Sequence, residues 1–177
     1  MIITRLSPLL GLLFSALAVA PGFGRDRDDS LVVFLVRHAE KLEAEADPDL
    51  STKGRARAQV LASTLQSAGI THVHSSDYKR TRNTAGAVSK ELGLKTKIYD
   101  PRELPSLITQ LKNMGGRHLV VGHSNTTPAL AKLLGGVPGS AIDEKREFDR
   151  LYVITIDQSG KASTLLLRYG VSFVKGR

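Results

Sequence analysis

Two histidines and two arginines stand at three points where an apolar stretch of the sequence gives way to a helical pattern. Arg37 and His38 follow the apolar run 31–36, Arg80 lies just after a second such junction, and His123 follows a third. Guanidinium groups bind phosphate oxygens two at a time and stay charged at working pH. A neutral imidazole can attack phosphorus, and a protonated imidazole can stabilise negative charge on a phosphoryl oxygen. We therefore predict a site that binds and transfers a phosphoryl group.

Each of these side chains has a predicted role. His38 is the candidate nucleophile: one ring N–H would donate to a backbone carbonyl and leave the other nitrogen facing phosphorus. Arg37 and Arg80 are predicted to hold the phosphoryl oxygens, together with His123 and Ser124. The glycine before His123 permits close backbone approach, and the helix that follows can offer amide groups to the same anion.

These motifs do not identify the proton donor to the leaving group. Glu103, which follows Asp100-Pro101-Arg102 at the end of a predicted strand, is the first choice for the general acid. Glu40, two residues beyond His38, and Asp100 are the alternatives.

Two further groups of polar residues are assigned structural roles. The other three histidines, His72, His74 and His118, are predicted to lie on strands or at strand edges. No carboxylates accompany them in a pattern typical of metal ligands, so a metal site is not predicted there. The segment 145–150 alternates in charge and is interpreted as a solvated turn, with a role at a substrate entrance as the alternative. No metal and no cofactor are therefore expected.

Alternating strand and helix patterns must bring the candidate residues together. The expected strands cover 31–36, 71–75, 96–99, 119–121, 151–156 and 162–169, and the expected helices cover 52–68, 78–92, 104–114 and 127–134. The apolar stripe of the first helix is predicted to contain Ala56, Val60, Leu61, Thr64 and Leu65. Repeated strand–helix units predict an α/β fold, in which a mostly parallel sheet carries helices on both faces and antiparallel strands come late in the chain.

The composition fits one domain preceded by an export signal. The chain has 177 residues and no cysteine, which excludes disulfides and thiolate chemistry. Residues 1–20 combine one cation, an apolar run and a final Ala-Val-Ala, as is typical of a cleaved signal peptide; an uncleaved anchor is the alternative. The apolar run is shorter than the roughly 20 residues that cross a bilayer. We predict a signal peptide over 1–20, a linker over 21–30, a phosphatase domain over 31–177, and a periplasmic or secreted protein without a stable membrane span after cleavage.

The charge of the chain favours an anionic partner. The formal net charge is +8, which attracts phosphate esters, polyanionic surfaces and nucleic acid alike. Aromatic residues make up only 5%, and no basic run is interleaved with residues that stack on bases. A small phosphorylated substrate is therefore expected, and nucleic acid is not.

Three motifs resemble the histidine phosphatase, or phosphoglycerate-mutase-like, superfamily. They are residues 37–41 (Arg-His-Ala-Glu-Lys), 76–85, and 120–125 (Val-Val-Gly-His-Ser-Asn). The resemblance implies a three-layer sandwich with a mostly parallel mixed central sheet between helices. It also favours hydrolysis over the mutase reaction, because the mutases carry an asparagine several residues after the first histidine and long insertions that gate the site.

The resemblance further implies the roles of individual residues. His38 would become phosphorylated, and Arg37, Arg80 and His123 would hold the phosphoryl group without a metal. The acidic proton donor varies in position between branches of the family, and Glu103 is carried over on that basis.

We therefore predict a metal-independent phosphomonoesterase that acts through a phosphohistidine at His38. The alternative is a non-catalytic protein of the same fold that binds phosphate or a phospholigand, and a basic protein that binds a polyanion is a third possibility.

Overall fold

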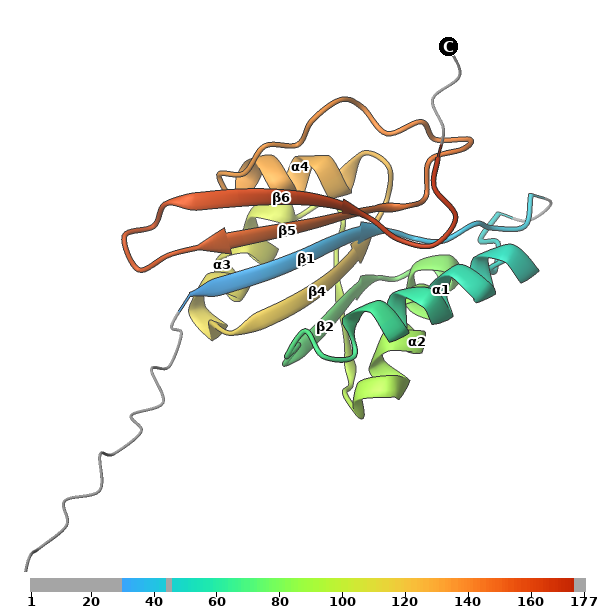
Figure 1. The fold of residues 1–177 in the computed structure, drawn as a ribbon, viewed down its shortest axis with the longest axis horizontal. Coiled ribbons are helices and arrows are strands. Elements are labelled where there is room, and N and C mark those ends of the chain that lie inside the picture. The colour runs from blue at the N-terminus through green and yellow to red at the C-terminus, as the bar shows by residue number, and fades with distance from the viewer. Residues whose placement is uncertain (1–29, 44–45, 174–177) are drawn as a thin grey trace, which may run out of the picture.

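The fold is built around one six-stranded sheet, shown in Figure 1. The structure is a computed structural model that describes residues 30–43 and 46–173. The strands are β1 (Leu31–Arg37), β2 (His72–Ser76), β3 (Thr96–Tyr99), β4 (Arg117–Gly122), β5 (Arg150–Ile156) and β6 (Ala162–Arg168). The helices of this part of the chain are α1 (Thr52–Leu65), α2 (Lys79–Leu92), α3 (Leu104–Met114) and α4 (Thr126–Leu133).

The N-terminal predictions fall outside this description. The signal peptide predicted over 1–20 lies outside the described residues, and so does the linker predicted over 21–30, except for Ser30. Within the described ranges, no helix has the length and apolar character needed to cross a membrane.

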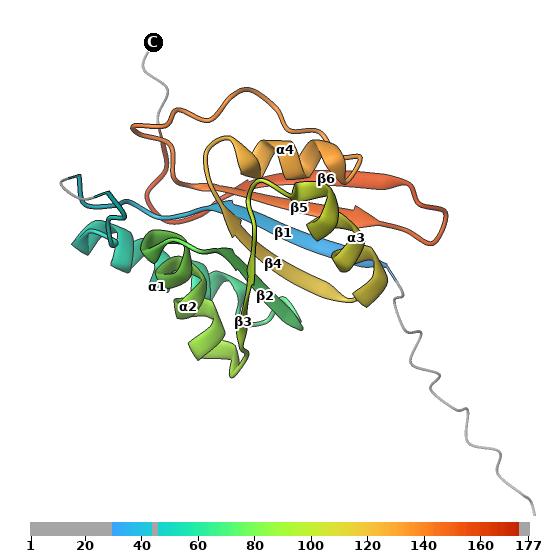
Figure 2. The same ribbon diagram turned by 180° about the vertical axis from the view of Figure 1, so that it is seen from behind.

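The sheet separates two apolar layers. Alternate side chains of β1 point to opposite faces: Leu31, Val33 and Leu35 pack with α3 and α4, and the side chains between them pack with α1 and α2. Figures 1 and 2 show the same division from the two sides of the sheet. A strand that is buried on both faces needs apolar residues at every position, which explains the unbroken apolar run in β1. The predicted three-layer α/β sandwich is confirmed.

The mixed sheet brings the three motifs to one edge. Its strand order is β3-β2-β4-β1-β5-β6, with parallel pairing from β3 to β1 and antiparallel pairing of β5 with both β1 and β6. In register, Arg37 lies opposite Gly122 and Ser75 lies opposite Val121. The carboxyl ends of β1, β2 and β4 therefore meet, at the kind of edge where open α/β sheets bind their ligands.

Helix α1 is rotated relative to its predicted apolar stripe. Its buried face includes Arg57, Ala58 and Ala62, whereas Val60, which belongs to the predicted stripe, is 42% exposed. Arg57 turns inward because its Nε and Nη2 donate to the Glu40 carboxylate over 2.9 to 3.1 Å. The prediction for this face is partly wrong. It is based on the spacing of apolar residues, and such a pattern cannot include a buried arginine.

Residues 147–150, just before and at the start of β5, are buried, although the alternating charges of 145–150 predict a solvated turn. Glu147, Asp149 and Arg150 are at most 5% exposed. Arg150 Nε donates to Glu147 Oε1 at 2.7 Å, and Arg168 Nη1 donates to Glu147 Oε1 at 2.8 Å and to Asp149 Oδ1 at 2.7 Å. The prediction is correct for Lys145 and Arg146, which are exposed, and wrong for 147–150, because the charges there pair with opposite charges inside the protein instead of facing water.

The three histidines outside the predicted site lie on strands, as predicted: His72 and His74 on β2, and His118 on the neighbouring β4. The rings of His72 and His118 stack with their centroids 4.7 Å apart, and His74 Nε2 lies 3.1 Å from His118 Nδ1. Burial lowers the pKa of His74 to about 3. Among the described residues, no group of acidic and imidazole side chains has an arrangement suited to a metal ion.

Gly54 allows close contact between α1 and the chain that leaves β1. A Cβ at this position would lie 2.0 Å from the Glu40 carbonyl oxygen, so Gly54→Ala must displace one of the two backbones. We expect the free energy of unfolding to fall by about 1–3 kcal/mol or more, the scale of an overpacked core, in a urea titration. Gly86 in α2 is the matched control, because a Cβ there meets nothing within 4 Å. Gly86→Ala should stabilise the protein by about 0.5–1 kcal/mol, and a similar loss in both variants would contradict the packing argument.

Candidate active site

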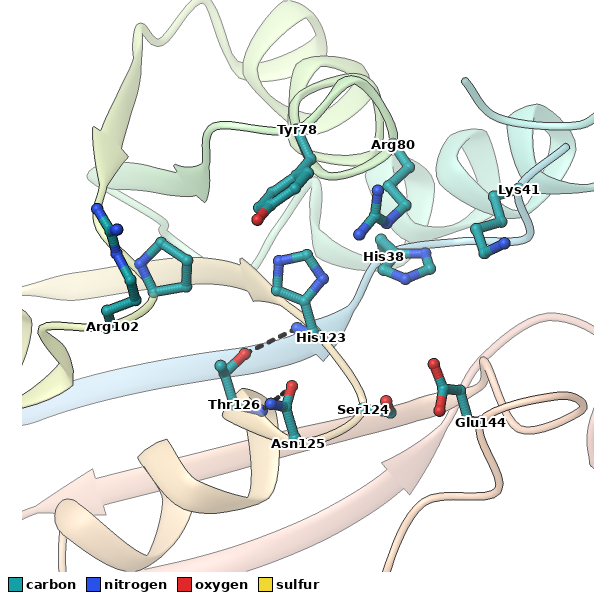
Figure 3. A pocket seen from close by; sticks show the side chains of 11 residues that line it. His38, Lys41, Tyr78, Arg80, Arg102, His123, Ser124, Asn125, Thr126 and Glu144 are labelled. Carbon is teal, nitrogen blue, oxygen red and sulfur yellow. Dashed lines mark hydrogen bonds between the residues drawn. The ribbon is translucent and has the colours of Figure 1, made fainter. Parts of the chain in front are cut away.

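A cavity of about 460 Å³ opens at the edge where the parallel strands end (Figure 3). Four of the predicted site residues line it: His38 after β1, Arg80 in the first turn of α2, and His123 and Ser124 after β4. They meet because β1, β2 and β4 are neighbours that end at the same edge of the sheet. Arg37 and Glu103 do not line this cavity.

His38 is held in one tautomer. Its Nδ1 lies 2.8 Å from the Ala39 carbonyl oxygen, and a carbonyl can only accept, so Nδ1 carries the proton. The Nε2 atom keeps its lone pair, which confirms the predicted donation from the ring to a backbone carbonyl. Burial, together with the charges of Arg37 and Arg80, lowers the pKa of His38 to about 3. The ring is therefore neutral near pH 7, the form in which an imidazole is a nucleophile.

His123 is the second imidazole of the cavity. Its ring centroid lies 5.6 Å from that of His38, with the two planes at 68°. Its Nε2 lies 2.9 Å from Ser76 Oγ, which donates to Thr81 Oγ1 at 3.1 Å, so β2 and α2 orient this ring. Burial first, and then the two nearby guanidinium charges, lower its pKa to about 4. The protonated form expected for His123 therefore requires a bound anion to stabilise it.

Arg37 binds a loop of the protein with most of its guanidinium group. Its Nη1 donates to the carbonyl oxygens of Asp143 and Glu147 at 3.1 and 3.0 Å, and its Nη2 donates to the Glu144 carbonyl at 2.6 Å. The guanidinium carbon also lies 4.0 Å from the centre of the Phe148 ring. Burial lowers the pKa of Arg37 to about 10, which leaves the group charged near pH 7. Three of its five N–H groups are thus engaged, which leaves Nε and one N–H of Nη2 to act as the predicted phosphate ligand.

Both arginines retain a buried donor. Arg37 Nε and Arg80 Nε have no hydrogen-bond partner among the described residues. Arg80 is otherwise well packed, with its guanidinium carbon 4.6 Å from the centre of the Tyr78 ring and its Nη1 3.5 Å from Asp47 Oδ1. Buried donors without acceptors are rare and destabilising. Two of them close to a neutral imidazole suit an oxyanion such as phosphate.

Gly122 brings β4 close to the start of α4. A Cβ at Gly122 would lie 2.7 Å from Thr126 Oγ1, which confirms that this junction needs close approach. The Thr126 N–H donates to Asn125 Oδ1, and the Thr127 N–H donates to the His123 carbonyl. The backbone N–H groups at the start of α4 are predicted to bind an anion. Those of Thr126 and Thr127 cannot do so while they keep these hydrogen bonds.

Glu103 is not brought to the cavity. It is exposed and is the N-cap residue of α3, whereas Pro101 and Arg102, just before it, do line the cavity. Because α3 begins at Leu104, Glu103 belongs to the helix end and not to the stretch that borders His38. The structure thus gives no geometric support to Glu103 as the general acid.

The two alternative carboxylates are engaged elsewhere. Glu40 binds the guanidinium group of Arg57, and Asp100 accepts from Arg102 Nη2 at 2.8 Å. The hydrogen bonds from Arg102 lower the pKa of Asp100 to about 2. Neither Glu40 nor Asp100 lines the His38 cavity.

Seven further residues line the cavity, and four of them have charged or aromatic side chains that the sequence did not assign to the site: Lys41, Tyr78, Arg102 and Glu144 (Figure 3). The Tyr78 ring meets the His123 ring edge-on at 5.0 Å. Lys41 and Tyr78 lie within the first two motifs, close to His38 and Arg80 in the sequence. Their place in the site could therefore have been predicted from this proximity. Glu144 has no such signal, because it lies 107 residues after Arg37, whose side chain binds its carbonyl group.

Part of the sequence matches a known family. Residues 33–102 match the sequence model of the histidine phosphatase superfamily, branch 1, which confirms the resemblance seen in the motifs. The probable phosphoglycerate mutase GpmB of Photorhabdus laumondii is 31% identical over 132 residues, which cover 70% of this chain and 59% of that protein. The protein of the same name from Yersinia enterocolitica is 38% identical over 79 residues, which cover 41% and 36% of the two chains. The chain thus spans less than two thirds of the length of these curated relatives.

Solved structures share the fold. The protein histidine phosphatase SixA complexed with tungstate has a TM-score of 0.63 and 22% identity, and the match covers 77% of this chain and 96% of that one. A putative alpha-ribazole-5'-P phosphatase from Escherichia coli has a TM-score of 0.62 and 18% identity, with 82% and 99% covered. The chain therefore has the fold of these histidine phosphatase structures.

The two site histidines should not titrate near neutral pH. Because their pKa values are lowered to about 3 and about 4, we expect the ring signals of His38 and His123 in proton NMR to stay constant between about pH 8 and pH 5. Loss of a signal in His38→Gln or His123→Gln assigns each ring. Inorganic phosphate should move the His123 midpoint upward, since a bound dianion favours the imidazolium form. A midpoint near the ordinary value of about 6.5 for either ring in the free protein would contradict the described electrostatics.

Proposed function

We propose that the chain, whose residues 33–102 match the model of the histidine phosphatase superfamily, branch 1, is a metal-independent phosphomonoesterase acting through a phosphohistidine at His38. The observation that carries the proposal is the neutral Nε2 of His38 close to two buried guanidinium donors that lack acceptors among the described residues. A phosphoryl group satisfies both requirements at once, because its oxygens accept from the arginines while its phosphorus accepts the imidazole lone pair.

The proposed reaction has two steps. First, His38 Nε2 forms a bond to phosphorus while the bond to the ester oxygen breaks, and that oxygen takes the electron pair and a proton. Arg37 Nε, Arg80 and a protonated His123 hold the remaining oxygens as their charge shifts in the transition state. Water then attacks the phosphohistidine, the electron pair returns to Nε2, and inorganic phosphate leaves.

Hydrolysis and transfer to a second organic acceptor are the two outcomes open to a phosphohistidine. The sequence relatives bear the name of mutases, and the fold relatives bear the name of phosphatases. We favour hydrolysis because this chain covers 96% and 99% of the two solved structures that bear the name of phosphatases, but only 59% and 36% of the two sequence relatives that bear the name of mutases.

The cavity favours a small anionic ester. Lys41, Arg80 and Arg102 contribute positive charge to its wall, against the single carboxylate of Glu144 among the described lining residues. Figure 3 shows Lys41 and Arg102 on opposite sides of the two histidines. We therefore propose a small phosphorylated substrate whose remaining polar or anionic groups contact one of these cations.

Replacing His38 is the direct test of the proposed function. We expect His38→Ala to lower turnover of 4-nitrophenyl phosphate by a factor on the order of 10⁴ or more, the scale seen when a covalent nucleophile is removed. Wild-type protein quenched during turnover of a ³²P-labelled ester should carry acid-labile, base-stable label on His38. His72→Ala is the matched control, because it removes a histidine that lies on β2 and outside the cavity; it should keep both turnover and label.

Other results would point to other functions. Saturable binding of phosphate without turnover would indicate the non-catalytic phospholigand-binding protein. Transfer of label to a second phosphoglycerate without release of phosphate would indicate a mutase. Strong inhibition by EDTA would indicate a metallophosphatase and would end the proposal of a metal-independent reaction.

We also propose that residues 1–20 act as a signal peptide and that the mature protein is periplasmic or secreted. The proposal rests on the apolar run and the Ala-Val-Ala sequence. N-terminal sequencing of the protein from periplasmic and culture-medium fractions should find a new terminus near residue 21. Full-length protein confined to the cytoplasm or held in the membrane fraction would contradict this.

A further inference from the structure

Glu144 is the one carboxylate among the side chains that line the His38 cavity in the described part of the chain. Figure 3 shows it entering the cavity beside Ser124, across from Tyr78 and Arg80. Its carboxylate makes no hydrogen bond or ion pair within residues 30–43 and 46–173, in contrast to those of Glu40 and Asp100. Glu144 thus has a free carboxylate in the place where the reaction needs an acid.

The backbone that carries Glu144 is fixed relative to the nucleophile. Arg37, the residue next to His38, donates to the carbonyl groups of Asp143, Glu144 and Glu147. The turn is also closed on itself: the Glu147 N–H donates to the Asp143 carbonyl at 2.9 Å, and the Asp143 N–H donates to Glu147 Oε2 at 3.1 Å. The turn therefore holds the backbone of Glu144 in place, and its exposed side chain faces the cavity without any change in the loop.

Electrostatics place the Glu144 carboxylate near the phosphate ligands. Burial lowers the pKa of Arg37, and among the neighbouring charges Glu144 opposes that effect most strongly. The Nε of the same guanidinium group is the buried donor that lacks an acceptor among the described residues. A phosphoryl group held between Arg37 Nε and His38 would therefore lie close to Glu144.

We propose that Glu144 is the proton donor to the leaving group and the base that activates water in the second step. This inference rests on the proposed phosphatase activity, and it assigns to Glu144 the role that the sequence suggests for Glu103. In the first step, the carboxylic acid of Glu144 gives its proton to the ester oxygen as the P–O bond breaks and the bond from His38 Nε2 to phosphorus forms. The products of this step are a free alcohol, a phosphohistidine and the Glu144 carboxylate.

The second step restores the enzyme. The Glu144 carboxylate takes one proton from water as the water oxygen bonds to phosphorus, and the N–P bond breaks with its electron pair returning to Nε2. Glu144 is again a carboxylic acid, His38 is again neutral, and the sum of the two steps is ester plus water giving alcohol plus phosphate.

The test compares a good leaving group with a poor one. In Glu144→Gln, kcat/KM for glycerol 2-phosphate should fall by about 10²-fold or more, because an alkoxide leaves poorly without a proton. The same variant should change kcat/KM for 4-nitrophenyl phosphate only a few-fold, since nitrophenolate leaves without help. Loss of the base should also slow hydrolysis of the phosphohistidine, so a burst of nitrophenolate should precede the steady state.

Two matched variants complete the experiment. Glu91→Gln removes an exposed carboxylate of α2 that does not line the cavity, and it should leave both substrates unaffected. Glu103→Gln tests the residue suggested by the sequence. If Glu144 is the proton donor, this variant should not lower kcat/KM for glycerol 2-phosphate more than kcat/KM for 4-nitrophenyl phosphate.

The outcomes separate this inference from the proposed function. A selective loss with the alkyl ester and a burst in Glu144→Gln support the role of Glu144. Equal losses with both esters, or a selective loss in Glu103→Gln instead, overturn that role and leave the phosphatase proposal intact. No turnover of either ester by the wild-type protein overturns the proposed function itself.

Discussion

The buried guanidinium group of Arg37 is the constraint on which the site depends. A charge in the interior has to be neutralised or bound by dipoles, and Arg37 is bound by three carbonyl groups of the turn 143–147. Because Arg37 ends β1 and directly precedes His38, this contact ties the end of the central strand to a turn that lies far away in the sequence. His38, Arg37 and the backbone of the turn that carries Glu144 are therefore held together.

Other buried charges tie loops together in the same way. Arg57 of α1 binds the Glu40 carboxylate and donates to the carbonyl groups of Tyr169 and Val171, so the chain after His38 is linked to the segment after β6. Glu147 binds Arg150 and Arg168 beneath the turn that Arg37 holds. Buried ion pairs add little net stability compared with apolar packing, but breaking one leaves an uncompensated charge. In this protein they connect loops to distant segments of the chain. These contacts hold the loops in place, as backbone hydrogen bonds hold strands and helices.

The same burial sets the chemistry of the histidines. Removing water from around His38 and His123 disfavours their charged forms, and the two arginine charges act in the same direction. Both rings are therefore neutral in the free protein, which provides a lone pair on His38 without a separate base. A bound phosphate dianion would offset the arginine charges and so favour a proton on His123.

The kinds and order of the strands and helices followed from the sequence, because they depend on local signals. The apolar run of β1, the bounds of β3 and α3, and the glycine after α2 were all visible in short stretches of residues. The meeting of His38, Arg80 and His123 was also predictable, since parallel strands bring their carboxyl ends to one edge whatever the details of packing.

Only the tertiary structure decided which polar and charged side chains are buried and which partners they bind. Glu103 becomes a helix cap outside the cavity, Arg57 turns into the core, and the charged residues of 147–150 are buried. Most of the nitrogen atoms of Arg37 bind the turn that presents Glu144. Each of these results depends on a partner that lies far away along the chain or in another layer of the fold. Such pairings leave no mark in local composition or periodicity, because a charged residue has the same pattern whether its partner is water or a buried opposite charge.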